Sequence, residues 1–192
     1  MKKILKISIT LIVMISLFAC GKNESKVVEF VENPTDPGIN ETTASVDKAR
    51  YNLAQGMEMP NIVVETNKGT TFDLSKADKP VFINFWTTWC PPCRAEMPSI
   101  QNLYEEYRNK MDFILIDLKE SKQTVQDFLI ENEFFTFPVG YDPTDIYGDK
   151  LSIISIPTTF IVGKNKIIKN YIIGMRTEEQ YREYINDALD EK

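Results

Sequence analysis

The hydrophobic pattern of residues 81–116 changes between strand and helix spacing. Residues 81–86 and 113–116 are short, nearly continuous apolar runs, which is typical of central strands covered on both faces. Between them, apolar residues recur three or four positions apart, which predicts an amphipathic helix. A strand, a helix and a second strand are therefore expected in succession. The residues on the helical stripe are Met97, Ile100, Leu103, Tyr104 and Tyr107.

Two hairpins are expected, one on each side of this unit. Residues 62–65 and 70–74 flank the turn-like sequence Thr-Asn-Lys-Gly, and residues 159–162 and 167–173 flank Gly-Lys-Asn. Extended apolar runs separated by such short polar turns are typical of antiparallel strand pairs.

The C-terminal residues are predicted to form a helix that starts with a capping box made by Thr177 and Gln180. Another stripe, around Val125 and Phe128, predicts a helix after the second central strand. Strands that alternate with helices and end in a hairpin and a helix predict an α/β fold, with a central mixed sheet flanked by helices. The apolar positions of the last helix are Tyr181, Tyr184, Ile185, Ala188 and Leu189.

The N-terminal segment has the pattern of a targeting sequence. Three lysines precede an apolar run at residues 7–19, which is too short to span a membrane as a helix. The sequence Leu-Phe-Ala-Cys that ends at Cys20 resembles a bacterial lipobox, which implies cleavage after residue 19 and a lipid on Cys20. We therefore expect a lipoprotein signal peptide at residues 1–19, a lipidated, flexible tether at 20–55 and a folded domain at 56–192. An ordinary secretory signal and an uncleaved anchor are the alternatives.

Composition narrows the chemistry to thiols, carboxylates, hydroxyls and lysines. The 192 residues include 22 basic and 28 acidic side chains and no histidine, so the formal net charge is −6. This balance argues against nucleic-acid binding. The missing histidine removes Ser-His and Cys-His catalytic pairs, as well as the usual nitrogen ligands of zinc.

Two of the three cysteines, Cys90 and Cys93, lie directly between the first predicted central strand, residues 81–86, and the helix that follows it. At this spacing both sulfurs share one face of the first helical turn and can form a small disulfide ring. The helix dipole favours a thiolate on Cys90. Because Pro91 and Pro92 lack backbone N–H groups, the nearest backbone donor left for the Cys90 sulfur is that of Cys93. Without a cation between the cysteines, the pair is interpreted as a reductant or an isomerising catalyst.

The sequence Phe-Trp-Thr-Thr-Trp-Cys-Pro-Pro-Cys-Arg-Ala-Glu-Met-Pro at residues 85–98 resembles the active-site stretch of the TlpA/ResA branch of the thioredoxin superfamily. Residues 155–160, Ser-Ile-Pro-Thr-Thr-Phe, resemble the cis-proline loop of that family. The resemblance covers about residues 56–190, including an inserted helix and strand around residues 122–141. It implies a thioredoxin-like fold and an extracytoplasmic, membrane-anchored thiol-disulfide oxidoreductase that needs no cofactor or metal.

The resemblance also implies individual roles. Cys90 would be the attacking nucleophile and Cys93 the resolving thiol. Pro157 would be cis and expose the backbone of Ile156 for pairing with a substrate, while Trp89 would pack beside the reactive sulfur. The buried aspartate of cytosolic thioredoxins is replaced here by Asn84, which cannot accept a proton. Glu96, one turn beyond Cys93, is a candidate proton acceptor, and a helix-surface carboxylate is the alternative.

Partners follow from the same resemblance. The expected substrates are disulfide-containing envelope proteins, with apocytochrome c or an exported methionine sulfoxide reductase as examples. The expected electron donor is a transmembrane carrier of the CcdA/DsbD kind, and the expected location is the outer face of the bacterial cell membrane, through the lipid anchor.

Three other functions fit parts of the pattern. The cysteine pair could be half of a zinc site, although four ligands cannot be completed within this chain. Thr87 precedes Cys90 by three residues, as in peroxiredoxins, but Ile83 stands where that motif has a proline. A non-catalytic binding lipoprotein on a thioredoxin-like scaffold is the third alternative.

Overall fold

A computed structural model describes residues 51–133 and 135–190. The predicted signal segment, Cys20 and the tether up to residue 50 lie outside the described residues. The elements, in chain order, are β1 (Val63–Glu65), β2 (Thr71–Asp73), the 3-10 helix η1 (Leu74–Lys76), β3 (Val81–Trp86), α1 (Pro91–Tyr107), β4 (Asp112–Leu118), α2 (Lys122–Glu131), β5 (Val139–Asp142), α3 (Ile146–Lys150), β6 (Thr158–Val162), β7 (Ile168–Ile173) and α4 (Glu178–Leu189).

Five strands form the central sheet in the order β5-β4-β3-β6-β7. β3 pairs in parallel with β4, and β4 in parallel with β5, whereas β6 runs antiparallel to β3 and to β7. The sheet is therefore mixed, as expected, and the inserted helix and strand are α2 and β5. The two long apolar runs correspond to β3 and β4. Both strands are buried on both faces, which explains why their sequences are apolar almost throughout.

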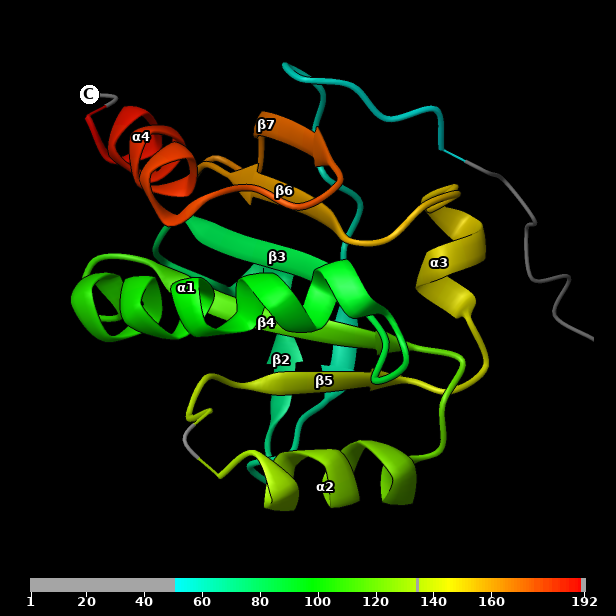
Figure 1. Cartoon of the computed structure of the whole chain (residues 1–192). Helices are drawn as coiled ribbons and strands as arrows, with labels where there is room; N and C mark the ends of the chain where they lie inside the picture. The colour runs from blue at the N-terminus through cyan, green and yellow to red at the C-terminus, as the bar shows by residue number, and fades with distance from the viewer. Residues whose placement is uncertain (1–50, 134, 191–192) are drawn as a thin grey trace, which may run out of the picture. The chain divides into compact units, whose positions relative to one another are not determined.

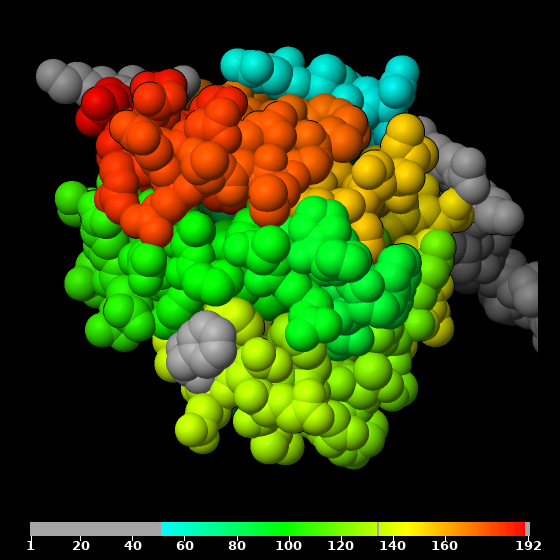
Figure 2. Space-filling model, in the orientation of Figure 1, coloured from blue at the N-terminus to red at the C-terminus, as the bar shows by residue number. Residues whose placement is uncertain are grey.

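Alternate residues of β3 face two separate cores. Phe82 and Trp86 pack in the core beneath α1, α2 and α4, and Ile83 and Phe85 pack in the core on the opposite face. In Figure 1, α1 crosses in front of the sheet, and Figure 2 shows its atoms filling the surface between those of α4 and α2. The apolar stripes predicted for these helices are core positions.

Both outer edges of the sheet are partly covered by other segments. The turn between β1 and β2 lies against β5, where Asn67 and Val139 exchange two hydrogen bonds of 2.8 and 2.9 Å. Gly140 permits this approach, because a Cβ atom there would lie 2.6 Å from a methyl group of Val64. At the other edge, Gly56 and Met57 pair with the first residue of β7. Backbone groups at the start of each edge strand therefore already have partners.

One boundary and one helix differ from the sequence-based expectation. The packed region starts before Gly56, because Leu53 is already buried in the core and the backbone N–H of Tyr51 donates to the carbonyl of Lys150. Helix α3 was not predicted from the apolar pattern. Its first turn forms because the carboxylate of Asp142 accepts backbone N–H groups at the start of that helix.

The last helix starts as predicted, since Thr177 and Gln180 form the complete capping box. Among residues 51–133 and 135–190, no helix is long and apolar enough to cross a membrane.

Candidate active site

Cys90 and Cys93 are joined by a disulfide at the start of α1. Their Cα atoms lie 5.3 Å apart. Cys90 is the N-cap residue of the helix, and its sulfur accepts a hydrogen bond from the backbone N–H of Cys93 at 3.3 Å. The predicted pairing of the sulfurs and the predicted donor are both confirmed.

The two prolines determine how many donors the Cys90 sulfur has. An N-cap side chain accepts from the second or third residue of its helix, and here Pro92 occupies the second position. We predict that Pro92→Ala, which restores an N–H group at that position, lowers the pKa of the Cys90 thiol in the reduced protein by about one unit. The pH dependence of thiolate absorbance or of alkylation measures this pKa.

Pro91→Ala is the matched control for that measurement. Pro91 is the first helical residue, whose N–H does not point at the N-cap side chain. Equal pKa changes in the two variants would contradict the argument and would indicate a general loosening of the turn.

The disulfide is recessed beneath an exposed rim. Cys90 is only 3% exposed, while Trp89 beside it is 68% exposed. Pro91 and Pro92 are exposed as well. Trp89 thus lies largely in solvent and offers an apolar surface next to the sulfurs.

The peptide bond between Ile156 and Pro157 is cis, as the resemblance implied. Thr158, the next residue, pairs with Phe85 near the end of β3, so this loop lies at the same end of the sheet as Cys90. The carbonyl of Pro157 accepts a hydrogen bond of 2.8 Å from Gly174. The cis-proline loop and the loop after β7 are therefore held together at this end.

Glu96 is buried, with 2% of its surface exposed, so the surface alternative is wrong. Its Oε1 accepts from Asn84 Nδ2 at 2.9 Å, and its Oε2 accepts from the hydroxyl of Tyr181 at 3.0 Å and the backbone N–H of Arg176 at 3.3 Å. Burial raises the pKa of Glu96 to about 7, although these donors and the Arg176 charge oppose the rise. A carboxyl with this pKa can exchange a proton near neutral pH.

Tyr181 and Thr159 complete this polar site, and the sequence pattern predicted neither of them as a site residue. Tyr181 belongs to the apolar stripe of α4 and was assigned to the core. Its ring does pack there, edge-on to Phe82 at 5.2 Å between centroids. Its hydroxyl, however, reaches both Glu96 and Thr159. A tyrosine on an apolar stripe near a buried glutamate is the signal that could have indicated this contact.

Glu120, which follows β4, stabilises the segment before Cys90. The carboxylate of Glu120 accepts from the backbone N–H and the hydroxyl of Thr88, at 2.6 and 2.7 Å. Asp117 is fully buried at the end of β4, and burial together with the negative charge of Glu120 raises the pKa of its carboxyl to about 9. The loop that leads into Cys90 is thus fixed to the loop after β4.

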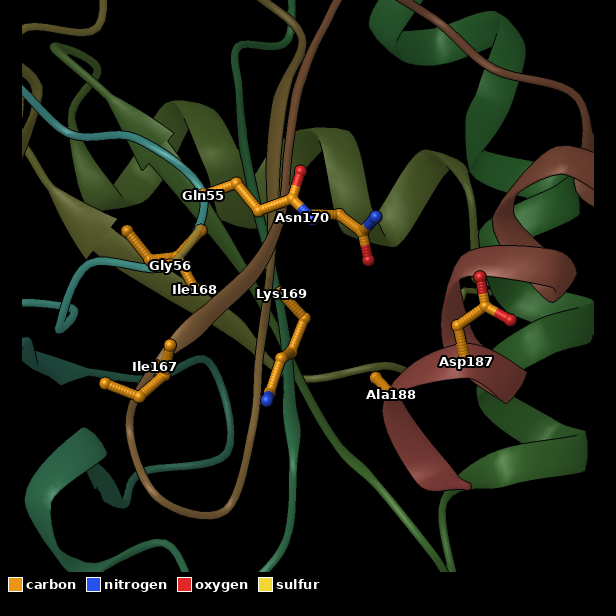
Figure 3. Close-up of a pocket in the computed structure, with 8 residues that line it drawn as sticks. All are labelled: Gln55, Gly56, Ile167, Ile168, Lys169, Asn170, Asp187 and Ala188. Atoms are coloured by element: carbon orange, nitrogen blue, oxygen red, sulfur yellow. The ribbon is translucent and has the colours of Figure 1, made fainter. Parts of the chain in front are cut away.

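Cavities are present both close to the disulfide and far from it. One of about 400 Å³ lies between α1 and α2 and is lined by Pro91, Arg94 and Phe128 among others. Another of about 260 Å³ lies between β7 and α4, with Lys169 on the strand and Asp187 on the helix (Figure 3). In the part of the chain that the structure describes, no group of three or more His, Cys, Asp or Glu side chains is arranged to hold a metal ion.

Comparisons with known proteins agree with this geometry. The Redoxin family model matches residues 54–188. The thiol-disulfide oxidoreductase ResA of Bacillus cereus is 38% identical over 142 residues, which are 72% of this chain and 80% of that protein. ResA of Bacillus subtilis is 30% identical over 144 residues, 74% of this chain and 80% of that protein.

Among solved structures, StoA from Bacillus subtilis superposes with a TM-score of 0.60 at 28% identity and covers 66% of this chain and 96% of that structure. The match to the Redoxin model spans both the cysteine pair and the cis-proline loop. The chain belongs to the Redoxin family and is a ResA/TlpA-like thiol-disulfide oxidoreductase of the thioredoxin superfamily.

Proposed function

We propose that this protein reduces disulfide bonds in client proteins outside the cytoplasm, with Cys90 and Cys93 as its reactive dithiol. The observation that carries the proposal is the disulfide at the start of α1, next to an exposed apolar rim and one helical turn from the buried Glu96. The bridged pair is the oxidised product of the proposed reaction.

The reaction consists of two thiol-disulfide exchanges. The Cys90 thiolate attacks one sulfur of the client disulfide, which forms a mixed disulfide and releases the other client sulfur as a thiolate. Cys93 then loses its proton and attacks the Cys90 sulfur, which releases the second client thiolate. Two electrons move to the client, and the enzyme disulfide is formed. A separate electron donor must reduce it again.

Glu96 is the proposed proton acceptor for Cys93. The two residues are three positions apart on α1, so they share a face of the helix. Asn84 takes no proton and instead donates to Glu96. The carboxylate thus does the work that an aspartate at position 84 would otherwise do.

The client backbone is proposed to pair with Ile156 beside the cis-proline, as an added strand. Exposed apolar side chains lie on the segments that meet at this end of the sheet: Trp89 precedes Cys90, Ile154, just before the cis-proline loop, is 88% exposed, and Met175 is exposed in the loop after β7. This rim suits an unfolded or extended client with apolar residues near its cysteines.

The location and the partners rest on the N-terminal sequence and the family. We propose a lipid anchor on Cys20 and a position at the extracytoplasmic face of the cell membrane. The clients would be envelope proteins, with apocytochrome c or an exported methionine sulfoxide reductase as candidates, and a CcdA/DsbD-like membrane protein would supply electrons.

Trapping tests the proposed function. Cys93→Ser removes the resolving thiol, so we expect mixed disulfides to accumulate on Cys90 in cells that express the full chain. Mass spectrometry of the trapped adducts identifies the clients. The double variant Cys90→Ser/Cys93→Ser is the control. Adducts of equal amount on the double variant, or an absence of adducts on Cys93→Ser, would contradict the assignment.

A further inference from the structure

Four buried side chains from four different elements form a closed ring of hydrogen bonds around the carboxylate of Glu96. Asn84 Nδ2 lies 2.9 Å from both Glu96 Oε1 and Thr159 Oγ1. The hydroxyl of Tyr181 lies 3.0 Å from Glu96 Oε2 and 2.9 Å from Thr159 Oγ1. The ring thus joins β3, α1, β6 and α4 through one carboxylate.

The protons of the ring have only one arrangement when Glu96 is ionised. The amide of Asn84 donates one hydrogen to Glu96 and the other to Thr159, because an amide nitrogen cannot accept. Tyr181 has one hydroxyl hydrogen, which it donates to Glu96 Oε2. Thr159 therefore donates its own hydrogen to the oxygen of Tyr181. Every donor points toward the carboxylate, directly or through one hydroxyl.

A proton that arrives on Glu96 forces the hydroxyls of Tyr181 and Thr159 to reverse. Oε1 faces the amide hydrogen of Asn84 and cannot donate to it, so the proton must go to Oε2. There it needs an acceptor, and the oxygen of Tyr181 is at hydrogen-bond distance. Tyr181 can accept this proton in a hydrogen bond if its own hydroxyl hydrogen turns toward Thr159. The hydroxyl hydrogen of Thr159 must then point away from Tyr181. A hydroxyl can act in either direction, whereas the amide of Asn84 and the backbone N–H of Arg176 cannot.

We propose that Tyr181 is a positioning residue for the redox reaction: its reversible hydroxyl holds the ionised Glu96 before the proton of Cys93 arrives and accepts a hydrogen bond from Glu96 afterwards. This inference rests on the proposed role of Glu96 as proton acceptor. The S–H bond of Cys93 breaks and an O–H bond forms at Glu96 Oε2, so the ring gains one proton. The hydroxyls of Tyr181 and Thr159 rotate and their mutual hydrogen bond reverses, while their own O–H bonds stay intact.

The groups that face Glu96 agree with this role. Arg176, on the loop after β7, contributes its backbone N–H and its positive charge. Tyr181 on α4 is the largest of the influences that lower the pKa of Glu96, and burial acts against it. Asn84 on β3 and Thr159 on β6 carry no charge, and the cysteines are the other ionisable groups on the same face of α1.

The test replaces the hydroxyl and leaves the ring of the side chain in place. Tyr181→Phe keeps the ring packed against Phe82 and removes the hydroxyl, together with its hydrogen bonds to Glu96 and Thr159. Tyr107→Phe is the matched control, because the hydroxyl of Tyr107 also links α1 to α4, through Asn186 at 3.0 Å. Infrared difference spectra of the oxidised full chain follow the carboxylic C=O band of Glu96, which is identified by its loss in Glu96→Gln.

Tyr181→Phe is expected to shift the midpoint of the Glu96 titration upward by about one pH unit. At pH 7 it should then slow the resolution of the mixed disulfide about fivefold, with recovery at higher pH, since fewer molecules carry the ionised carboxylate. Tyr107→Phe should leave both the midpoint and the rate profile at their wild-type values.

Two outcomes separate the failure of this inference from the failure of the proposed function. If Glu96→Gln changes the pH profile of resolution but Tyr181→Phe behaves like Tyr107→Phe, the role of Tyr181 is overturned and that of Glu96 stands. If Glu96→Gln keeps the wild-type profile, the proton step of the proposed function fails.

A measurement on the unmodified sequence covers the case in which Tyr181→Phe does not fold. With isotope-labelled tyrosine rings, the C–O vibration of one tyrosine should change from donor to acceptor character at the pH where Glu96 becomes protonated. A tyrosine signal that does not change across this titration would overturn the inference.

Discussion

Cys90→Ser is expected to lower the rate of disulfide reduction by about 1000-fold or more. The serine hydroxyl stays protonated at neutral pH, and the one backbone donor at this position, the N–H of Cys93, cannot make it a comparable nucleophile. Reduction of insulin with a thiol as the electron source measures the rate, in detergent and with the full chain. The fold should be kept, because a serine side chain is close in size and shape to the cysteine that it replaces.

Cys20→Ser is the control for this substitution. Cys20 is the cysteine of the predicted lipidation site and has no proposed role in the redox reaction. Its replacement should therefore leave the rate of insulin reduction unchanged. If Cys90→Ser retained the wild-type rate while Cys20→Ser lost it, the assignment of the reactive thiol would be wrong.

Glu96→Gln is expected to slow resolution of the mixed disulfide by about 100-fold at pH 8, the lower range for loss of a general base. Because burial places the pKa of Glu96 at about 7, the wild-type rate should rise as the pH increases through 7 and the carboxylate forms. The variant should lack this rise, since an amide cannot take the proton. Stopped-flow tryptophan fluorescence, with Trp89 next to the disulfide, measures the step.

The pH profile of the resolution rate in Glu96→Gln distinguishes a loss of proton transfer from a packing defect. A uniform loss at every pH would indicate a packing defect in the ring around Glu96 and would count against proton transfer. A loss that is small below pH 6 and large above pH 7 is the expected outcome. Glu105→Gln on the same helix is the matched control, because Glu105 is exposed and should leave the profile unchanged.

The sequence predicted the parts of this protein that depend on local pattern. Residues 81–86 became β3 with the predicted bounds because a central strand is apolar throughout. The capping box at Thr177 formed because both of its hydrogen bonds are made within one turn. The cysteine pair and the cis-proline were identified because each depends on a few adjacent residues.

Features that depend on distant contacts were missed. Helix α3 has no apolar stripe, and its start is determined by Asp142, which accepts its first N–H groups. The burial of Glu96 was predictable in principle, since residues 93, 97 and 100 of the same helical face are buried. Its partner Tyr181 comes 85 positions further along the chain, and Thr159, which contacts Tyr181, comes 63 positions further. No local pattern connects them to Glu96.

The segments that pair with part of each sheet edge limit how copies of this protein can associate at high concentration. The turn after β1 occupies part of the β5 edge, and residues 56–57 occupy the start of β7. At these positions the backbone groups already have partners, so a second copy cannot use them to extend the sheet. Self-association through an added strand would therefore have to use other parts of the two edges, away from Val139 and Ile168.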